Sequence, residues 1–161
     1  MKSLTIDPLK DCVPVRTNTR VLDVLLSKEL QIPMLCGGKG FCSTCHVWVE
    51  EGMENLTPVT ARERATLGLI SGANSKSRLS CQAKIIGEPV RVLVPNVKYM
   101  EKSTDLLSLV GKRAEQYILH PIDGRILVEK GKIITKSRIL ELSNLDHDIE
   151  RIRTVVADAD A

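Results

Sequence analysis

The strongest structural information in this chain lies in ten consecutive residues, Cys36-Gly37-Gly38-Lys39-Gly40-Phe41-Cys42-Ser43-Thr44-Cys45, here named the cysteine loop. Its cysteines follow a C-x5-C-x2-C pattern, and a further cysteine stands 36 positions after Cys45. Clustered thiols in a reducing compartment are more often metal ligands than disulfide partners. An odd total of five cysteines also argues against a disulfide framework. The pattern therefore indicates a metal site with four candidate ligands: Cys36, Cys42, Cys45 and Cys81.

The spacing of these cysteines separates two kinds of four-thiolate site. A structural zinc site usually joins two short C-x2-4-C pairs. Here three thiols share one loop and the fourth is distant, which suits a [2Fe-2S] rhomb in which each iron takes two thiolates. Such a cluster is negatively charged, and the glycines of the loop allow backbone N–H groups to approach its sulfurs. The hydroxyls of Ser43 and Thr44 are further candidate donors. A structural zinc protein remains the alternative.

The residues around the cysteines resemble those of the plant- and vertebrate-type [2Fe-2S] ferredoxins. The similarity rests on Ile32-Pro33, Cys42-Ser-Thr-Cys45-His46 and Arg78-Leu-Ser-Cys81-Gln82, and the x5 loop is closest to the adrenodoxin-like branch. It covers residues 1–95. The resemblance implies a β-grasp fold, one-electron transfer, and a reductase and an electron acceptor as redox partner proteins. It also implies a [2Fe-2S] cluster held by Cys36, Cys42, Cys45 and Cys81.

Residue periodicity before Pro95 independently predicts an α+β domain with a mixed sheet packed against one main helix. Strands alternate polar and apolar residues, and helices carry apolar residues at helical spacing. The expected elements are a hairpin over 4–15, a helix capped by Asn18 or Thr19 and ending near Leu30, a strand over 44–49, a helix opened by a Thr60–Glu63 capping box and ending near Ile70, and strands over 79–86 and 90–94.

Residues 96–161, here named the extension, contain no cysteine and form a separate small α/β unit in this interpretation. A helix is expected to follow Ser103, with Leu106, Val110, Ala114 and Tyr117 on one face. Residues 126–128 and 133–134 are expected to pair as a hairpin. A final helix is expected to carry a stripe of Leu145, Ile149, Ile152 and Val156. This stripe either packs within the extension, forms a homodimer, or docks a redox partner.

Composition excludes several classes of function. The chain has 161 residues, a formal net charge of +3 and only 2% aromatic residues, so neither electrostatics nor base stacking indicates nucleic acid. No apolar run approaches the roughly 20 residues of a membrane helix, and no secretory signal is present, so a cytoplasmic protein is expected. We expect an electron carrier rather than an enzyme. The alternative is a redox-sensing protein in which the extension mediates assembly.

The charge near the site departs from the adrenodoxin-like branch, in which acidic residues dock the partners. Residues 62–84 hold five basic residues and one acidic residue, Glu63. The resemblance then implies a partner with an acidic or neutral patch, and a poor fit to a basic-faced ferredoxin–NADP reductase. Lys39, Arg62 and Arg64 predict a potential less negative than about −400 mV. His46 is expected to make a structural hydrogen bond, and Cys12 to be a small buried residue.

Overall fold

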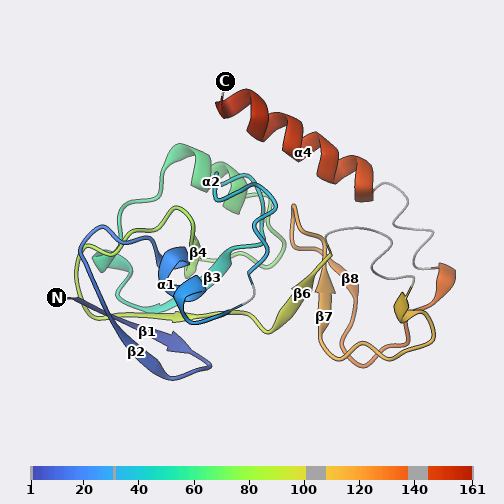
Figure 1. Ribbon diagram of the computed structural model, residues 1–161, viewed down its shortest axis with the longest axis horizontal. Helices are drawn as coiled ribbons and strands as arrows, with labels where there is room; N and C mark the ends of the chain where they lie inside the picture. Colours follow the sequence, from blue (N-terminus) through green and yellow to red (C-terminus); the bar gives the residue numbers. More distant parts are fainter. Residues whose placement is uncertain (1, 31, 101–107, 138–144, 161) are drawn as a thin grey trace.

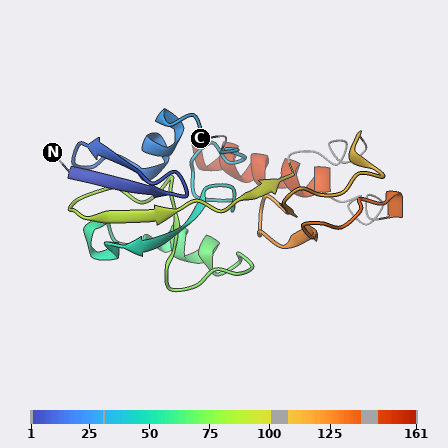
Figure 2. The same ribbon diagram turned by 90° about the horizontal axis from the view of Figure 1, so that it is seen from below.

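The computed structural model describes residues 2–30, 32–100, 108–137 and 145–160 (Figure 1). It contains a five-stranded sheet with two short helices, followed by a three-stranded sheet and a long C-terminal helix. Figure 2 shows the two sheets arranged end to end along the longest axis. Within the described residues, no helix is both long enough and apolar enough to cross a membrane.

The first sheet is mixed, with strand order β2-β1-β5-β3-β4. Its strands are β1 (Lys2–Asp7), β2 (Asp11–Val15), β3 (His46–Glu51), β4 (Ser77–Leu79) and β5 (Val90–Leu93). β1 and β5 are parallel, and the other neighbours are antiparallel. Alternation places Leu4 and Ile6 in the core, where helix α1 (Val21–Ser27) packs through Val21, Val24 and Leu25. The α+β β-grasp fold expected from the sequence is confirmed.

Three local expectations for this sheet and its helix were wrong. Neither Asn18 nor Thr19 caps α1, because both backbones pair with Ile85, and Arg20 occupies the N-cap position without a side-chain bond. α1 also ends at Ser27 rather than near Leu30. The strand predicted over 79–86 stops at Leu79. The N–H groups of residues 82 and 83 donate back to the Leu79 carbonyl, which folds the chain into a turn containing Cys81.

Helix α2 (Ala61–Leu67) begins where the capping pattern predicted. The Thr60 side chain accepts a hydrogen bond from the Glu63 N–H at 3.2 Å. A short 3-10 helix, η1 (Met53–Asn55), precedes it after Gly52. Gly52 has a φ of 87°, and a Cβ there would lie 2.0 Å from the Pro89 carbonyl oxygen, so only glycine fits this crossing.

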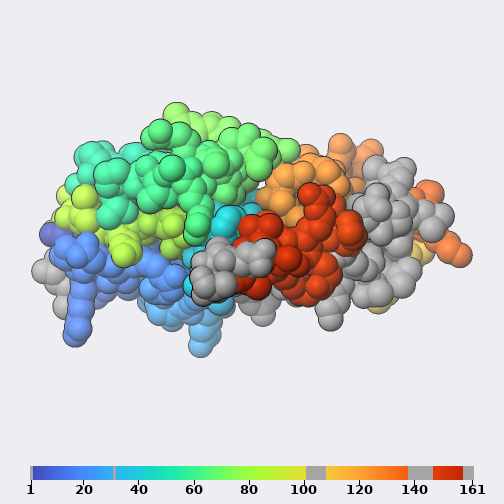
Figure 3. All heavy atoms as spheres, turned by 90° about the horizontal axis from the view of Figure 1, so that it is seen from above, coloured from blue at the N-terminus to red at the C-terminus, as the bar shows by residue number. Residues whose placement is uncertain are grey.

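The extension forms a second sheet in the order β6-β7-β8. Its strands are β6 (Val97–Tyr99), β7 (Tyr117–Leu119) and β8 (Ile126–Val128). A small core of Met100, Ala114, Ile118, Leu127, Val128, Ile134 and Ile149 packs beside them. Helix α4 (Leu145–Asp160) confirms the predicted final helix and contributes Ile149 to this core. Figures 1 and 3 show α4 lying across the cysteine loop and the extension.

The other two predictions for the extension were wrong. Ser103 and Leu106 lie outside the described residues, and residues 108–109 form a short 3-10 turn, but Val110, Ala114 and Tyr117 are not helical. Gly111 turns the chain at a φ of 84°, and Tyr117 begins β7, because β6 offers a parallel partner with Val97 opposite Tyr117. The expected hairpin is absent as well within the part of the chain that is described. β8 pairs with β7, whereas Ile133 forms an isolated bridge with Arg113.

Candidate metal centre

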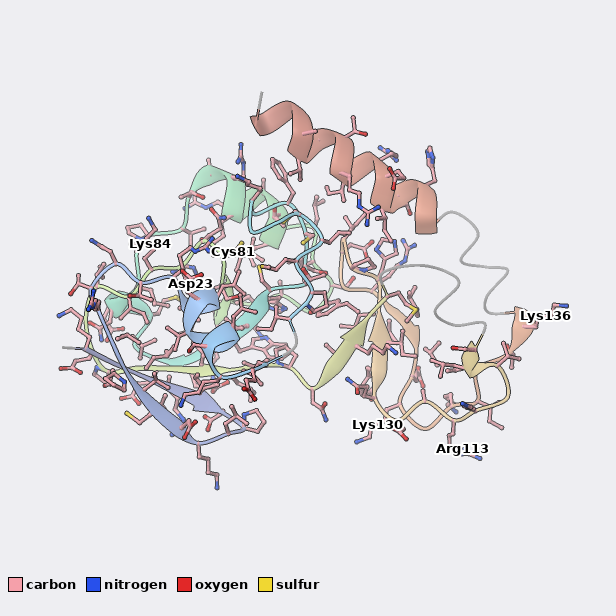
Figure 4. All side chains as sticks on the ribbon, viewed as in Figure 1. Asp23, Cys81, Lys84, Arg113, Lys130 and Lys136 are labelled. Carbon is pink, nitrogen blue, oxygen red and sulfur yellow. The ribbon has the colours of Figure 1, made fainter. Side chains whose placement is uncertain are left out.

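The fold brings the four predicted ligand residues together as two pairs of thiols. The cysteine loop lies between α1 and β3, and Cys81 occupies the turn after β4. The sulfurs of Cys36 and Cys42 are 3.3 Å apart, and those of Cys45 and Cys81 are also 3.3 Å apart. None is in a disulfide, and all four are between 1% and 4% exposed. Figure 4 labels Cys81, which lies beneath the cysteine loop.

Pairing of this kind suits a group in which each pair of thiols holds its own metal ion. Two thiolates on one tetrahedral metal, with metal–sulfur bonds of about 2.3 Å, lie about 3.8 Å from each other. Each pair is close to that separation. In a [2Fe-2S] cluster each iron takes two protein thiolates, so the donor set matches this group in number and arrangement.

Backbone N–H groups approach the Cys36 sulfur of the first pair, as expected from the glycines of the cysteine loop. Gly37, Gly38 and Gly40 have φ values of 64°, 79° and 83°. In this conformation the N–H groups of Lys39, Gly40 and Phe41 donate to the Cys36 sulfur. Such donors stabilise negative charge on sulfur, which is what a thiolate ligand and a reduced cluster require.

Each pair holds one acidic and one weakly acidic thiol. The hydrogen bond from Cys42 lowers the pKa of Cys36 to about 5, and Cys42, which donates it and is buried, has a raised pKa. The hydrogen bond from Cys45 likewise lowers the pKa of Cys81, while the pKa of Cys45 is raised. Each pair is therefore prepared to present a thiolate to an incoming metal.

The two hydroxyls predicted as donors behave differently. The Thr44 Oγ1 lies 3.1 Å from the Cys42 sulfur, in agreement with the expectation. The Ser43 hydroxyl instead donates to the carbonyl oxygen of Pro121 in the extension, at 2.9 Å. A donor that the sequence analysis did not consider, the Gln82 amide, lies 3.4 Å from the Cys81 sulfur.

A buried ion pair supports the turn that carries Cys81. The Arg78 Nε donates to a Glu63 carboxylate oxygen at 2.7 Å, and the side chains are 2% and 0% exposed. The same carboxylate oxygen accepts the Leu79 N–H at 3.0 Å. Sequence reasoning counted both charges as surface charges and so missed this support. Because Arg78 and Glu63 are buried, the charged residues exposed within residues 62–84 are all basic: Arg62, Arg64, Lys76 and Lys84.

The remaining predictions concern His46 and Cys12, and Phe41 lies in the cysteine loop. His46 makes the expected structural hydrogen bond, with its Nε2 2.7 Å from the Ser77 hydroxyl, and burial lowers its pKa to about 4. Phe41 is half-buried beneath the Arg62 guanidinium, 4.5 Å from the ring centroid. The expectation that Cys12 is buried was wrong: it is exposed on the edge strand β2, opposite Thr5.

Comparison with known proteins identifies the family. Residues 4–85 match the family described as 2Fe-2S iron-sulfur cluster binding domain. The chain therefore belongs to this family, and its cofactor is a [2Fe-2S] cluster. The relatives are ferredoxins, a class of electron carriers. The 2Fe-2S ferredoxin-5 of Aquifex aeolicus is 37% identical over 71 residues, covering 44% of this chain and 74% of the relative.

Further relatives cover the same part of the chain. The 2Fe-2S ferredoxin of Escherichia coli is 31% identical over 101 residues, which are 59% of this chain and 91% of the relative. The crystal structure of the ISC-like [2Fe-2S] ferredoxin from Pseudomonas putida has a TM-score of 0.56 and 28% identity, covering 59% of this chain and 93% of that one. A ferredoxin from Rhodopseudomonas palustris gives a TM-score of 0.51 and 31% identity, covering 58% and 96%. Most of the extension lies beyond these matches.

Proposed function

We propose that Cys36, Cys42, Cys45 and Cys81 bind the [2Fe-2S] cluster, and that the chain carries single electrons between a reductase and an acceptor enzyme. The observation that carries this proposal is the pairing of four buried thiols at 3.3 Å. Cys36 and Cys42 then bind one iron, and Cys45 and Cys81 bind the other. When bound, the cluster supplies a site that gains and loses one electron.

The protein itself supplies an environment rather than a chemical step. Its N–H groups stabilise the charge on the sulfurs, and burial of the thiols limits contact of the cluster with water. No bond to a substrate is needed for electron transfer, so the protein is a carrier and not an enzyme. In this proposal residues 1–95 form the ferredoxin domain, and residues 96–161 form an extension with a separate role.

The exposed charge beside the cysteine loop selects the partner. Arg62 and Arg64 are exposed on α2, and Glu63 between them is buried against Arg78. The face next to the loop is therefore positively charged, and complementarity favours a partner with an acidic or neutral docking patch. A basic-faced ferredoxin–NADP reductase is expected to be a poor partner.

Redox titration and stopped-flow oxidation test the carrier function. The protein is expected to take up one electron per chain.

The rate of its oxidation by the anion hexacyanoferrate(III) is expected to fall as salt is added, whereas the rate of oxidation by the cation hexaammineruthenium(III) is expected to rise. The double variant R62E/R64E should reverse both trends. The double variant K130E/K136E changes the net charge equally on the extension, away from the cysteine loop (Figure 4), and should leave both trends unchanged. Uptake of two electrons, or of none, would refute the carrier.

A redox-sensing role is the second candidate, and one contact favours it. The Ser43 N–H, between Cys42 and Cys45, donates to the Pro121 carbonyl of the extension at 3.0 Å, so the cysteine loop and the extension are directly hydrogen-bonded. A homodimer through the stripe on α4 stays a prediction; Ile149 of that stripe is buried within the chain. Size-exclusion chromatography of oxidised and reduced protein distinguishes the roles, because only a sensor of this kind changes its assembly with oxidation state.

A further inference from the structure

Ser43 gives both of its hydrogen-bond donors to the extension. The residue is 0% exposed and lies between Cys42 and Cys45. Its N–H donates to the Pro121 carbonyl oxygen at 3.0 Å. Its hydroxyl donates to the same oxygen at 2.9 Å and lies 3.3 Å from the His120 carbonyl oxygen.

The neighbouring donors of the cysteine loop point to sulfur instead. The N–H groups of Lys39, Gly40 and Phe41 donate to Cys36, the Thr44 N–H donates to Cys42, and the Thr44 hydroxyl lies 3.1 Å from the Cys42 sulfur. Ser43 is thus flanked on both sides by groups that stabilise negative charge on the sulfurs. The N–H and hydroxyl of Ser43 donate instead to the Pro121 carbonyl, so they do not stabilise negative charge on the sulfurs. The negative end of this carbonyl faces the cysteine loop.

The extension segment that accepts these bonds is packed firmly against the loop. The Ser71 N–H donates to the Asp123 carbonyl at 2.7 Å. Gly124 is buried with a φ of +70°, and a Cβ there would lie 3.4 Å from Ile70 Cγ2 and 3.7 Å from the Ser43 Oγ. Pro121 is buried as well. This packing excludes water from the Ser43 side of the cysteine loop.

We propose that the extension lowers the reduction potential of the cluster through its contact with Ser43. Reduction adds one electron, forms and breaks no bond, and leaves the cluster one unit more negative. Three features of the contact oppose that added charge: the diverted donors of Ser43, the nearby Pro121 carbonyl, and the exclusion of water. The inference rests on the proposed function, and it makes the extension a determinant of the driving force for electron transfer.

Two glycine variants separate this effect from general strain. Gly124→Val places a side chain against Ser43 and Ile70 and should lift the 120–124 segment from the loop. Gly131→Val is the matched control, because Gly131 also has a positive φ, of +86°, but an added Cβ there meets nothing within 4 Å. Midpoint potentials are measured by EPR-monitored titration with mediators, on protein whose iron and sulfide have been counted.

The Gly124→Val protein should have a less negative midpoint than the wild type. The ratio of reduced to oxidised protein at a fixed potential should rise about twofold to tenfold, a tenfold change corresponding to 59 mV. Gly131→Val should match the wild type. Gly124→Leu also extends a side chain beyond the Cβ position and should shift in the same direction, and it provides the test if the valine variant does not fold.

The proposal would be overturned by cluster-loaded Gly124 variants with the wild-type midpoint or a more negative one. An equal shift in Gly131→Val would also overturn it. Absence of a cluster from the wild-type protein would be a different result, because it would refute the proposed function itself.

Discussion

The five-stranded sheet and the extension achieve stability in different ways. The central strands of the first sheet, β1, β3 and β5, have four to six residues and bury Leu4, Ile6 and Val92 completely. Each strand of the extension has three residues, and Ile126 and Ile133 remain 56% and 53% exposed. A sheet this small buries little apolar surface by itself. We therefore expect the extension, whose core is small, to rely more on its contacts with the cysteine loop than the first sheet does.

Loss of a proposed ligand should have the largest effect and should be confined to the first region. Cys45→Ser removes one thiolate of the second pair, and we expect the variant to contain little or no [2Fe-2S] cluster. Iron and sulfide content and visible absorption measure this directly. Cys12→Ser is the matched control, since Cys12 is exposed on β2, and it should retain a full cluster. A fully loaded Cys45→Ser protein would contradict the ligand assignment.

Breaking the buried ion pair should destabilise the first region next most strongly. Glu63→Gln preserves volume but leaves the Arg78 guanidinium buried without a counter-charge, at a cost of about 3–5 kcal/mol in the free energy of unfolding. Urea denaturation followed by circular dichroism measures it. Lys76→Ala removes an exposed pair with Glu50 and should cost less than about 1 kcal/mol. Equal costs for both variants would show that the Glu63 pair is not structural.

A cavity in the core of the extension should loosen only that region. Ile149 is 2% exposed, and Ile149→Ala should cost about 2–5 kcal/mol locally. Hydrogen exchange should then show faster exchange of the α4 amides and unchanged exchange in β1 and β5. Val155→Ala, at a position 45% exposed on the same helix, is the control and should exchange like the wild type. Faster exchange throughout the first sheet would mean that the two regions unfold together.

The smallest expected effect is a pH dependence of stability, which should be confined to the extension. Burial lowers the pKa of His120, opposed by Asp123 and Asp148 and assisted by Arg125. The folded extension therefore favours neutral His120, and the unfolded state binds more protons below its pKa of about 6.5. Stability of the extension should fall as pH decreases from about 6.5. Hydrogen exchange of α4 at pH 7.5 and 5.5 measures this, after correction for intrinsic rates. His120→Gln should remove the dependence, and its persistence in that variant would exclude His120 as the cause.

Sequence reasoning succeeded where local patterns and tertiary structure agree. The alternation of Leu4 and Ile6 and the Thr60 cap each encode their structure within a few residues, and the C-x5-C-x2-C run places three of the four cysteines in one loop. The failures arise from contacts between distant residues. The backbone pairing of Asn18 with Ile85, which prevents the expected cap, spans most of the first region.

The same reason explains what was missed at the site. No local pattern shows that Arg78 and Glu63 are buried together, since each looks like an ordinary surface charge. Nor does any local pattern reveal that Ser43 donates to Pro121, which lies in a region whose helix and hairpin were themselves assigned wrongly. Predictions for the extension were poor because its short strands owe their pairing to partners that composition alone does not identify.

The central claim is that the paired thiols hold a [2Fe-2S] cluster. EPR spectroscopy of the dithionite-reduced protein, with iron and acid-labile sulfide counted on the same sample, tests it most directly. We expect a spin-one-half signal of the [2Fe-2S] kind, with two irons and two sulfides per chain. A colourless, EPR-silent protein with about one zinc per chain would contradict it and would make the four cysteines a structural site.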